Sequence, residues 1–523
     1  MLLKDAHLGN IEVRTLPLPD YVKAPSGTYT YSGTVLVDYK REGDSPEFVR
    51  LAVTGDDGAG FREIFAGEIK RNPKSNGLRF MVFEDNKRIL LGDYVLECSP
   101  GIDSCESASL IPVVYPQWMH KDERVMFHWS EIIIAPDNEH ICWTVLSRSS
   151  AAVMLGRLSR KEGAYVIENI KTFSSHNPYI NDPENEGCAI PQPQRGGEVK
   201  QFVHGGIAVS MVGGGEKSVL PDPVVVDLRS EELEQITFQP GYEETCLFSP
   251  DEKLGMVMST RGSASTNCAI IGLVPRPYGL LSVSGAIWAV YTLAVSGARF
   301  AGKGNVGPAL IEISKSMSEP GYMGVLLNDP EQKWVYLSPM SWHPNGTKAM
   351  WPEMVSGNPK EKRLRIVELK DYVPSPSVPA AKTPEDIPFA SDGALDDWLD
   401  PVGNSEVKIA GKHSGFIEIA KQRGNSSTSY RHFSDDGKLF YDGYEKTSLT
   451  AELDSVYEAC FKAQDETTGD VVGEMNCRLT FSRCGSGHER YMKLLLEPAE
   501  DGKPKSYGYA RHEGKVIDVA SMA

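Results

Sequence analysis

Hydrophobic positions recur with the spacing of β-strands along most of the chain. Short runs rich in β-branched and aromatic residues are each bounded by Gly, Pro, Asn or Asp, which is typical of strands joined by tight turns. Clear examples lie at 34–39, 78–83, 224–228 and 364–369. Helical periodicity is limited to two short candidates, at 384–399 and 449–463. The pattern therefore predicts an all-β protein.

One turn phrase recurs at wide intervals among these strands. Its clearest copy, FSPDEK at 248–253, runs into the hydrophobic segment 254–259, and worn copies stand at 135–139, 342–348 and 433–438. A strand, a tight turn rich in Pro, Asp and Gly and a second strand make a hairpin. A hairpin repeated every few tens of residues indicates a radial or stacked repeat.

The spacing of the turns allows a count of repeats. One weaker turn, at 85–88, and two long gaps bring the candidates to seven, near positions 86, 136, 210, 250, 290, 344 and 436. The mean interval, (436 − 86)/6 or about 58 residues, exceeds the ~40–50 that is usual in propellers, so several blades should carry long loops. We predict one β-propeller domain over 1–523, most simply of seven blades, with six or eight left open and long excursions at 170–200 and 374–400.

Closure of such a ring needs a partner for its first strand. We expect the N-terminal strands at 29–39 to pair with C-terminal strands at 477–481 and 491–496. Closure of this kind removes the sheet edges that otherwise promote aggregation.

Composition and charge narrow the class of partner. The chain has 523 residues and a formal net charge of −17, so it repels a phosphate backbone, and we expect no nucleic-acid partner. It has no run approaching the ~18 consecutive apolar residues that cross a bilayer, so we expect no membrane partner. As written the chain resembles a soluble cytoplasmic protein, or a secreted one if a signal peptide was removed. Compartment and oligomeric state stay open.

The nine cysteines leave at least one free thiol, because their number is odd. Cys98 and Cys105 have the same spacing as Cys477 and Cys484. Either pair could close a hairpin disulfide or remain as buried thiols.

The stretch around the clearest turn resembles a known repeat. ITF at 236–238, FSPD at 248–251 and MSTRG at 258–262 are similar to one repeat of the TolB-like, or WD40-like (PD40), β-propeller superfamily. Glu252 stands where that repeat usually has Gly, and Ala135 where it has Ser. The superfamily includes translocation scaffolds, the propeller domains of prolyl oligopeptidase-like peptidases, and sugar-cleaving saponin hydrolases and oligogalacturonate lyases. The chain resembles the sugar-cleaving members faintly, and it lacks the Gly-x-Ser-x-Gly elbow of a peptidase domain.

The innermost strand of each propeller blade lines the central channel, so polar residues just before each turn are candidates for chemistry. Glu131 and Glu244 come from different blades and form our predicted pair of carboxylates, because a glycosidase sets an acid and a base ~5–10 Å apart. His128 and His204 complete the predicted catalytic set. The predicted substrate-binding residues are Trp129, His176, Tyr242, Trp342, His343, Tyr430, Arg431 and His432.

This inventory supports a first hypothesis and two rivals. The first is a hydrolase that cleaves a glycoside or uronic-acid conjugate at the channel mouth, with a small-molecule or oligosaccharide substrate and no cofactor. The second is a lyase of oligouronides, in which His, Tyr and Arg act as base and cation, with or without a divalent metal held by three histidines. The third is a non-catalytic propeller that binds a protein or peptide.

Plainer interpretations stand beside these hypotheses. A histidine on an inner strand also serves as a hydrogen-bonded structural residue, Glu244 also fits a solvated loop tip, and 430–432 also fits ordinary channel lining. Converging carboxylates in a deep polar site would favour an enzyme, whereas a flat apolar rim would favour a scaffold.

Overall fold

The protein is built almost entirely of antiparallel β-sheets. A computed structural model describes residues 1–147, 151–173, 179–191, 197–214, 219–261, 269–278, 306–319, 321–327, 333–392, 405–422, 425–450, 454–484 and 491–522. The helices in these ranges are short, for example α1 (Gln117–Lys121), α2 (Ala269–Gly272) and α5 (Ile313–Ser318). The predicted all-β fold class is confirmed. None of the helices in these ranges has the length and apolar character needed to cross a membrane.

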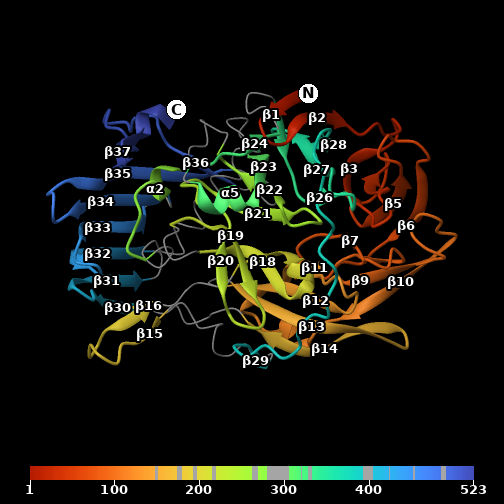
Figure 1. Cartoon of the computed structure of the whole chain (residues 1–523), viewed down its shortest axis with the longest axis horizontal. Helices are drawn as coiled ribbons and strands as arrows, with labels where there is room; N and C mark the ends of the chain where they lie inside the picture. The colour runs from red at the N-terminus through yellow and green to blue at the C-terminus, as the bar shows by residue number, and fades with distance from the viewer. Residues whose placement is uncertain are drawn as a thin grey trace.

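Units of four to six strands follow one another around a ring (Figure 1), and those of blades 2 and 3 are joined through β10 and β14. Blade 1 contains β3 (Lys23–Tyr29), β4 (Val35–Lys40), β5 (Phe48–Thr54) and β6 (Arg62–Glu68). Blade 2 contains β7 (Met81–Val82), β8 (Arg88–Leu90), β9 (Tyr94–Ser99) and β10 (Ser107–Val114). Blade 3 contains β11 (Val125–Ile134), β12 (His140–Ser147), β13 (Ala151–Lys161) and β14 (Ala164–Thr172).

The ring continues through three further sheets. Blade 4 contains β17 (Val199–Val203), β18 (Ala208–Gly213), β19 (Asp222–Asp227) and β20 (Leu233–Gln235). Blade 5 contains β21 (Glu243–Phe248), β22 (Leu254–Ser259), β23 (Gly307–Glu312) and β24 (Val325–Leu326). Blade 6 contains β25 (Trp334–Tyr336), β26 (Ser341–Trp342), β27 (Lys348–Val355), β28 (Asn358–Leu369), β2 (Gly9–Thr15) and β1 (Leu2–Asp5). The protein is therefore a β-propeller.

The first strands of neighbouring blades form the inside of the ring. Strand β11 packs against β17, β17 against β21, and β21 against β26. Side chains on these strands therefore meet across blade boundaries, which is the property that brings charged residues together below.

An N-terminal strand closes the ring, but its partner differs from the expected one. Strand β2 pairs antiparallel with β28, with Ile11 opposite Leu369 and Val13 opposite Val367. The predicted pairing of 29–39 with 477–481 and 491–496 is wrong, because the segment at 29–39 belongs to β3 and β4 of blade 1. Closure joins residues far apart in sequence, so local patterns do not reveal it.

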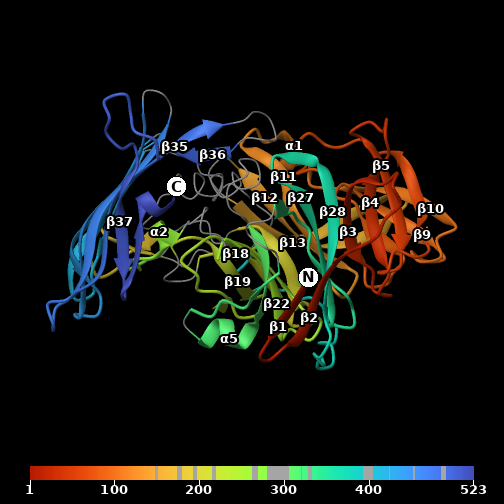
Figure 2. The same cartoon turned by 90° about the horizontal axis from the view of Figure 1, so that it is seen from above.

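A long sheet follows the ring in sequence. It contains β30 (Ser405–Ala410), β31 (Ser414–Gln422), β32 (Asn425–Ser434), β33 (Leu439–Leu449), β34 (Ser455–Asp465), β35 (Val471–Cys484), β36 (Tyr491–Leu494), β37 (Tyr507–His512) and β38 (Lys515–Asp518). We call it the C-terminal sheet. Figure 2 shows it curving along one side of the ring, in blue. Its buried face, with Tyr457 and Phe461, shares a core with Met256 and Trp351 of blades 5 and 6.

The count of seven blades is not confirmed. The turn at 434–438 joins β32 to β33 inside the C-terminal sheet, so it does not mark a blade. The candidate near 290 lies outside the described residues. The predicted helix at 449–463 is also wrong where the structure describes it, because β34 alternates buried and exposed side chains with strand periodicity.

The recurring turn has a common geometry that explains its residue types. Its Asp or Asn side chain accepts a hydrogen bond from the backbone N–H two residues later at Asp85, Asp137, Asp251, Asn345 and Asp436. The following residue is left-handed in each copy: Asn86, Asn138, Glu252, Gly346 and Gly437. Gly and Asn tolerate this conformation. Glu252 (φ 56°) does so while its carboxylate accepts the backbone N–H of His204 from blade 4 at 2.6 Å.

Residues 370–392, which overlap the predicted excursion at 374–400, run as an extended strap across these turns. The backbone N–H of Val378 donates to the carbonyl of Pro250, that of Ala381 to Gly205, and that of Thr383 to the Asp137 carboxylate. The strap thus ties blades 5, 4 and 3 together. It contains no helix between 384 and 392, where one was predicted, and 393–399 lies outside the described residues.

The other predicted excursion and the cysteines resolve more simply. Within 170–200, β15 (Tyr179–Asn181) and β16 (Ala189–Pro191) form a hairpin. Cys98, Cys105, Cys477 and Cys484 are free thiols, so neither candidate disulfide is present.

Candidate active site

Charged side chains from three blades converge on one lysine at the inside of the ring. The ammonium of Lys200, on β17, lies 3.1 Å from Glu198 Oε2 and 3.1 Å from Glu244 Oε1. Glu131 Oε1, from β11, lies 3.6 Å from the same nitrogen. The guanidinium of Arg79, just before β7 of blade 2, forms an ion pair with Glu131. We call these five residues the inner-strand cluster.

Carboxylates outnumber cations in this cluster, and that imbalance acts on Glu198. Burial disfavours its charged form, and although Lys200 opposes this, the nearby Glu131 and Glu244 add to it, so the pKa of Glu198 is raised. Burial alone would lower the pKa of Lys200, but the three carboxylates outweigh it and raise that pKa. Glu198 is therefore a carboxyl group that holds its proton to higher pH than usual, beside a permanently charged ammonium.

Solvent reaches the acids but hardly reaches the lysine. The side chains of Glu198 and Glu244 are 26% and 24% exposed, whereas that of Lys200 is 3% exposed. Tyr242 adds a neutral donor, since its hydroxyl donates to Glu244 Oε2 at 3.0 Å. A polar ligand could approach the carboxyl groups while the ammonium stays fixed beneath them.

The structure brings together three of the residues predicted from sequence. Glu131, Glu244 and Tyr242 all belong to or contact the inner-strand cluster. They lie on the first strands of blades 3 and 5, as the position before the turn phrase indicated, or directly before them. Their roles in chemistry remain a prediction.

His128 and Trp129 lie on β11 as well, but their side chains are buried within blades 2 and 3. The rings of His128 and Trp129 both contact Asp93 Oδ1, at 2.8 Å and 2.9 Å. Burial opposes ionisation of Asp93, yet hydrogen bonds from His128, Ser75 and Trp129 hold its pKa below the ordinary value. The structure thus gives both side chains hydrogen-bonded positions that hold two blades together.

His204, Trp342 and His343 lie at the other end of the inner strands, on the turn face. His204 Nε2 is 3.7 Å from Glu252 Oε2. The indole N–H of Trp342 donates to the Leu247 carbonyl at 2.8 Å, and the ring of His343 packs against Tyr29. The structure does not bring these three residues to the inner-strand cluster.

Tyr430, Arg431 and His432 lie on β32 of the C-terminal sheet, so they are not on an inner strand of the ring. Arg431 is exposed, and His432 pairs with Asp442 at 3.2 Å. They were expected in the channel because the turn at 434–438 resembles the blade turns. His176 lies outside the described residues.

Sequence reasoning missed Arg79, Glu198 and Lys200. Lys200 stands four positions before His204, one of the predicted site residues, so the available signal was a charged pair at 198 and 200. Residues two apart lie on the same face of a strand. The missing information was that this face meets Glu131 and Glu244 from other blades.

A second buried ion pair joins the ring to the C-terminal sheet. Arg276, which follows α2, donates to Glu445 Oε2 at 2.8 Å and Oε1 at 3.2 Å. The hydroxyl of Tyr430 donates to Glu445 Oε1 at 2.5 Å, and that of Tyr457 to Oε2 at 2.7 Å. We call these four residues the Arg276 cluster, and it holds the segment after α2 against the sheet.

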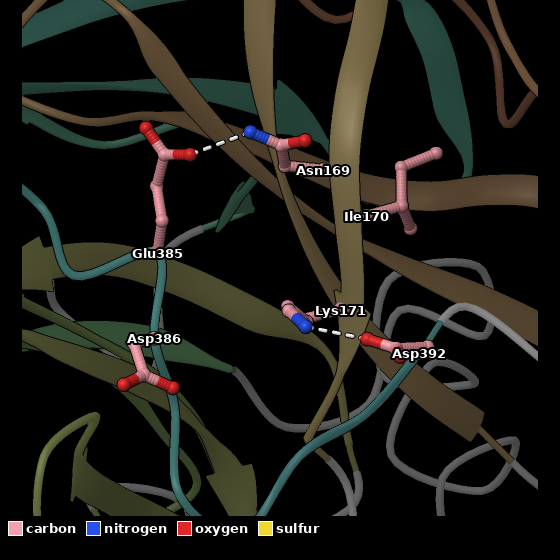
Figure 3. Close-up of a pocket in the computed structure, with 6 residues that line it drawn as sticks. All are labelled: Asn169, Ile170, Lys171, Glu385, Asp386 and Asp392. Carbon is pink, nitrogen blue, oxygen red and sulfur yellow. Dashed lines mark hydrogen bonds and ion pairs between the residues drawn. The ribbon is translucent and has the colours of Figure 1, made fainter.

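A separate pocket lies on the outer side of blade 3 (Figure 3). It has a volume of about 380 Å³ between β14 and the strap, and it is lined by Asn169, Ile170, Lys171, Glu385, Asp386 and Asp392. Asn169 donates to Glu385 at 2.6 Å, and Lys171 forms an ion pair with Asp392. Its lining is occupied by these internal pairs, and it is remote from the inner strands, so we do not assign the chemistry to it.

Metal binding finds no support in the part of the chain that the structure describes. No group of three His, Cys, Asp or Glu side chains there is arranged to hold an ion. Lys200 occupies the position between three carboxylates that a cation would take.

Comparisons with known proteins agree with the fold at low similarity. No protein-family model and no curated protein matches the chain. Among solved structures, a TolB from Agrobacterium tumefaciens is 10% identical with a TM-score of 0.32, covering 63% of this chain and 92% of that one. A luciferin-regenerating enzyme is 9% identical with a TM-score of 0.35, covering 71% and 100%. Prolyl oligopeptidase B from Galerina marginata is 9% identical with a TM-score of 0.27, covering 78% and 46%. Similarity at this level bears on the fold alone.

The predicted glycoside hydrolase, with a lyase as its alternative, is wrong. The similar structures include a prolyl oligopeptidase and a luciferin-regenerating enzyme, and neither of these is a glycosidase or a lyase, so the faint resemblance to sugar-cleaving members has no support. A glycosidase also needs one carboxylic acid free to protonate the leaving group. Glu131 and Glu244 are both ion-paired with Lys200.

Proposed function

We propose that the protein is a hydrolase that cleaves an ester or amide bond of a small molecule at the inner-strand cluster. The observation that carries this proposal is a carboxyl group with a raised pKa, Glu198, in contact with the buried ammonium of Lys200. Perturbed titratable groups that converge from several elements are typical of functional sites. Hydrolysis of a carbonyl compound needs both partners, a base for water and a cation for the developing oxyanion.

Each group has a defined role in this reaction. Ionised Glu198 accepts a proton from water as the water oxygen bonds to the carbonyl carbon. The proton then passes to the leaving oxygen or nitrogen when its bond to that carbon breaks. Two N–H groups of Lys200 are used by Glu198 and Glu244. Glu131 Oε1 lies 3.6 Å from the same nitrogen, and Lys200 acts on the developing oxyanion through its positive charge.

The proposal is tested with a panel of p-nitrophenyl esters, lactones and aminoacyl p-nitroanilides. We expect the wild-type protein to hydrolyse at least one class, and Glu198→Gln to lower kcat/KM by about 10²–10⁴-fold, the usual contribution of a general base. Because the base must be ionised, kcat/KM should rise with pH through a pKa above the ordinary range of Glu, and this limb should disappear in the variant.

Glu385→Gln is the matched control. Glu385 is also ion-paired and its side chain is 27% exposed, but it lies in the outer pocket, so activity should be unchanged. Equal activity of wild type and Glu198→Gln, or saturable binding of panel compounds without turnover, would remove the hydrolase proposal.

A further inference from the structure

A group of basic residues lies near the start of β11 in an otherwise acidic chain. The loop after β6 carries Lys70, Arg71 and Lys74, and the region of α1 carries His120 and Lys121. The net charge of the whole chain is −17, so such a group is unusual for this molecule. Two of these residues, Lys74 and His120, are held in place by specific contacts.

Lys74 has a fixed ammonium that is not ion-paired within the described ranges. Its Nζ donates to the backbone carbonyl of Asp122 at 2.7 Å. The carboxylate of Asp122 is engaged by Arg124 at 2.7 Å, and that of Asp93 by His128, Ser75 and Trp129. The neighbouring acids are thus committed elsewhere, and the charge of Lys74 remains open to a ligand.

His120 presents a second donor beside this ammonium. Its Nδ1 lies 3.0 Å from Asn72 Nδ2, and the Asn72 Oδ1 accepts the backbone N–H of Lys74 at 2.9 Å. Because the amide nitrogen of Asn72 donates, Nδ1 accepts and Nε2 carries the ring hydrogen. Burial, with the nearby charges of His128 and Lys74, lowers the pKa of His120. The partly exposed ring therefore offers a neutral N–H near a cation.

The loop that carries Lys74 runs beside β11, the strand that carries Glu131 of the inner-strand cluster. Ser75 bridges Trp129 in parallel, and Asn76 Nδ2 donates to the Ser130 carbonyl at 3.0 Å, so the loop follows β11 toward Glu131. Lys74 and Glu131 therefore lie on neighbouring segments of the chain.

We propose that Lys74 and His120 form a subsite for an anionic group, carboxylate or phosphate, of a small ligand. The identification of that ligand as the substrate rests on the proposed function. The ammonium of Lys74 supplies charge, and Nε2–H of His120 supplies a directed hydrogen bond, the combination that binds such anions. The substrate class is then an ester or amide that also carries an acidic group away from the scissile bond.

The test is calorimetric titration with inorganic phosphate and, in a second arm, with acetate, at ionic strength matched by chloride. We expect saturable binding of at least one anion, and the arm that binds identifies the anionic group. Lys74→Gln and His120→Gln should each weaken binding by about tenfold. Lys121→Gln is the matched control. Lys121 follows His120 in the sequence, but its ammonium donates to Gln117 Oε1 at 3.3 Å, so this substitution should leave the affinity for the anion unchanged.

Two outcomes would overturn the subsite: saturable binding of neither anion, or an equal loss of affinity in Lys74→Gln and Lys121→Gln, which indicates diffuse surface charge. The two proposals fail separately. Glu198→Gln should keep the wild-type affinity for the anion, so anion binding without hydrolysis leaves the subsite standing and removes the hydrolase. If the wild-type protein hydrolyses a panel compound but Lys74→Gln and His120→Gln both bind the anion as tightly as wild type, the hydrolase stands and the subsite is removed.

Discussion

The inner-strand cluster and the Arg276 cluster contain the same residue types but differ in charge balance and in exposure to solvent. Each contains glutamate and a basic residue drawn from segments far apart in sequence, and in each a tyrosine hydroxyl donates to a glutamate of the cluster. In the Arg276 cluster one arginine faces one glutamate, the side chains are 0% and 3% exposed, and both carboxylate oxygens accept hydrogen bonds. In the inner-strand cluster three glutamates face two cations, and two of the glutamates are about a quarter exposed.

Charge balance and solvent access separate the two roles. A matched pair with every polar atom satisfied has no proton to exchange, so it contributes to the specificity of packing. An excess of carboxylates around a fixed ammonium instead leaves one carboxyl protonated to higher pH, and solvent gives a ligand access to it. The difference teaches that balance and exposure, rather than residue type, distinguish a structural from a chemical cluster.

The largest effect on stability should follow from breaking the buried ion pair between Arg276 and Glu445. We expect Arg276→Met to lower the free energy of unfolding by about 3–5 kcal/mol, because Glu445 is left charged and buried. Urea unfolding measures this, and adding Glu445→Leu should recover part of the loss. A loss under about 1 kcal/mol would show that water enters the Arg276 cluster and that the comparison fails there.

Removing the central cation of the inner-strand cluster should have a smaller effect on stability, and one that depends on pH. We expect Lys200→Met to lower the free energy of unfolding by about 2–3 kcal/mol at pH 8, because three carboxylates lose their common partner. At pH 5 the loss should shrink, since protonation relieves their repulsion. Urea unfolding at both pH values tests this, and a loss that does not change with pH contradicts it.

The raised pKa of Glu198 predicts a slope in stability with pH. The folded state holds this proton above the pKa of the unfolded chain, so the free energy of unfolding falls as pH rises from about 4.3 through the raised pKa. The contribution is about 1.4 kcal/mol for each pH unit by which the pKa is raised. Asp38, Glu84 and Glu252 also have raised pKa values, so Glu198→Gln should make this slope shallower by the contribution of Glu198.

The loss of stability at acidic pH provides an internal control. Burial opposes ionisation of Asp93 and Asp137, yet hydrogen bonds, from His128 and His140 first among them, lower both pKa values. Stability from these groups is therefore lost as pH falls through and below the ordinary range of Asp. The loss of stability at low pH should be the same in wild type and Glu198→Gln. A change in it would point to a wider structural disturbance.

The smallest effects compare one hydroxyl in each cluster. Tyr457→Phe removes a donor to Glu445 in the Arg276 cluster and should lower the free energy of unfolding by about 1–3 kcal/mol. Tyr242→Phe removes the donor to Glu244, where solvent can replace it, and should cost less than about 1 kcal/mol. Thermal unfolding of the two variants side by side checks the order, and the reverse order contradicts our account.

The sequence was sufficient for features that are local. The left-handed position after each turn Asp follows from residue type, and the place of Glu131 and Glu244 near the inside of the ring follows from the turn beside them. The same turn at 434–438 is misleading, because a hairpin signal does not specify which sheet receives its strands. Pairing of β2 with β28, and convergence on Lys200, depend on contacts across the ring that no local pattern encodes.

The most direct test of the account is a titration of the Glu198 carboxyl. Protein labelled with ¹³C at the side-chain carboxyl of glutamate is followed by NMR across pH, in wild type and in Glu198→Gln. Burial also raises the pKa values of Glu84 and Glu252, so we predict several resonances that titrate above the ordinary range of Glu, one of which is absent from the variant. If no resonance titrates above that range, or if every resonance that does so in the wild type persists in Glu198→Gln, the central claim for the inner-strand cluster is contradicted.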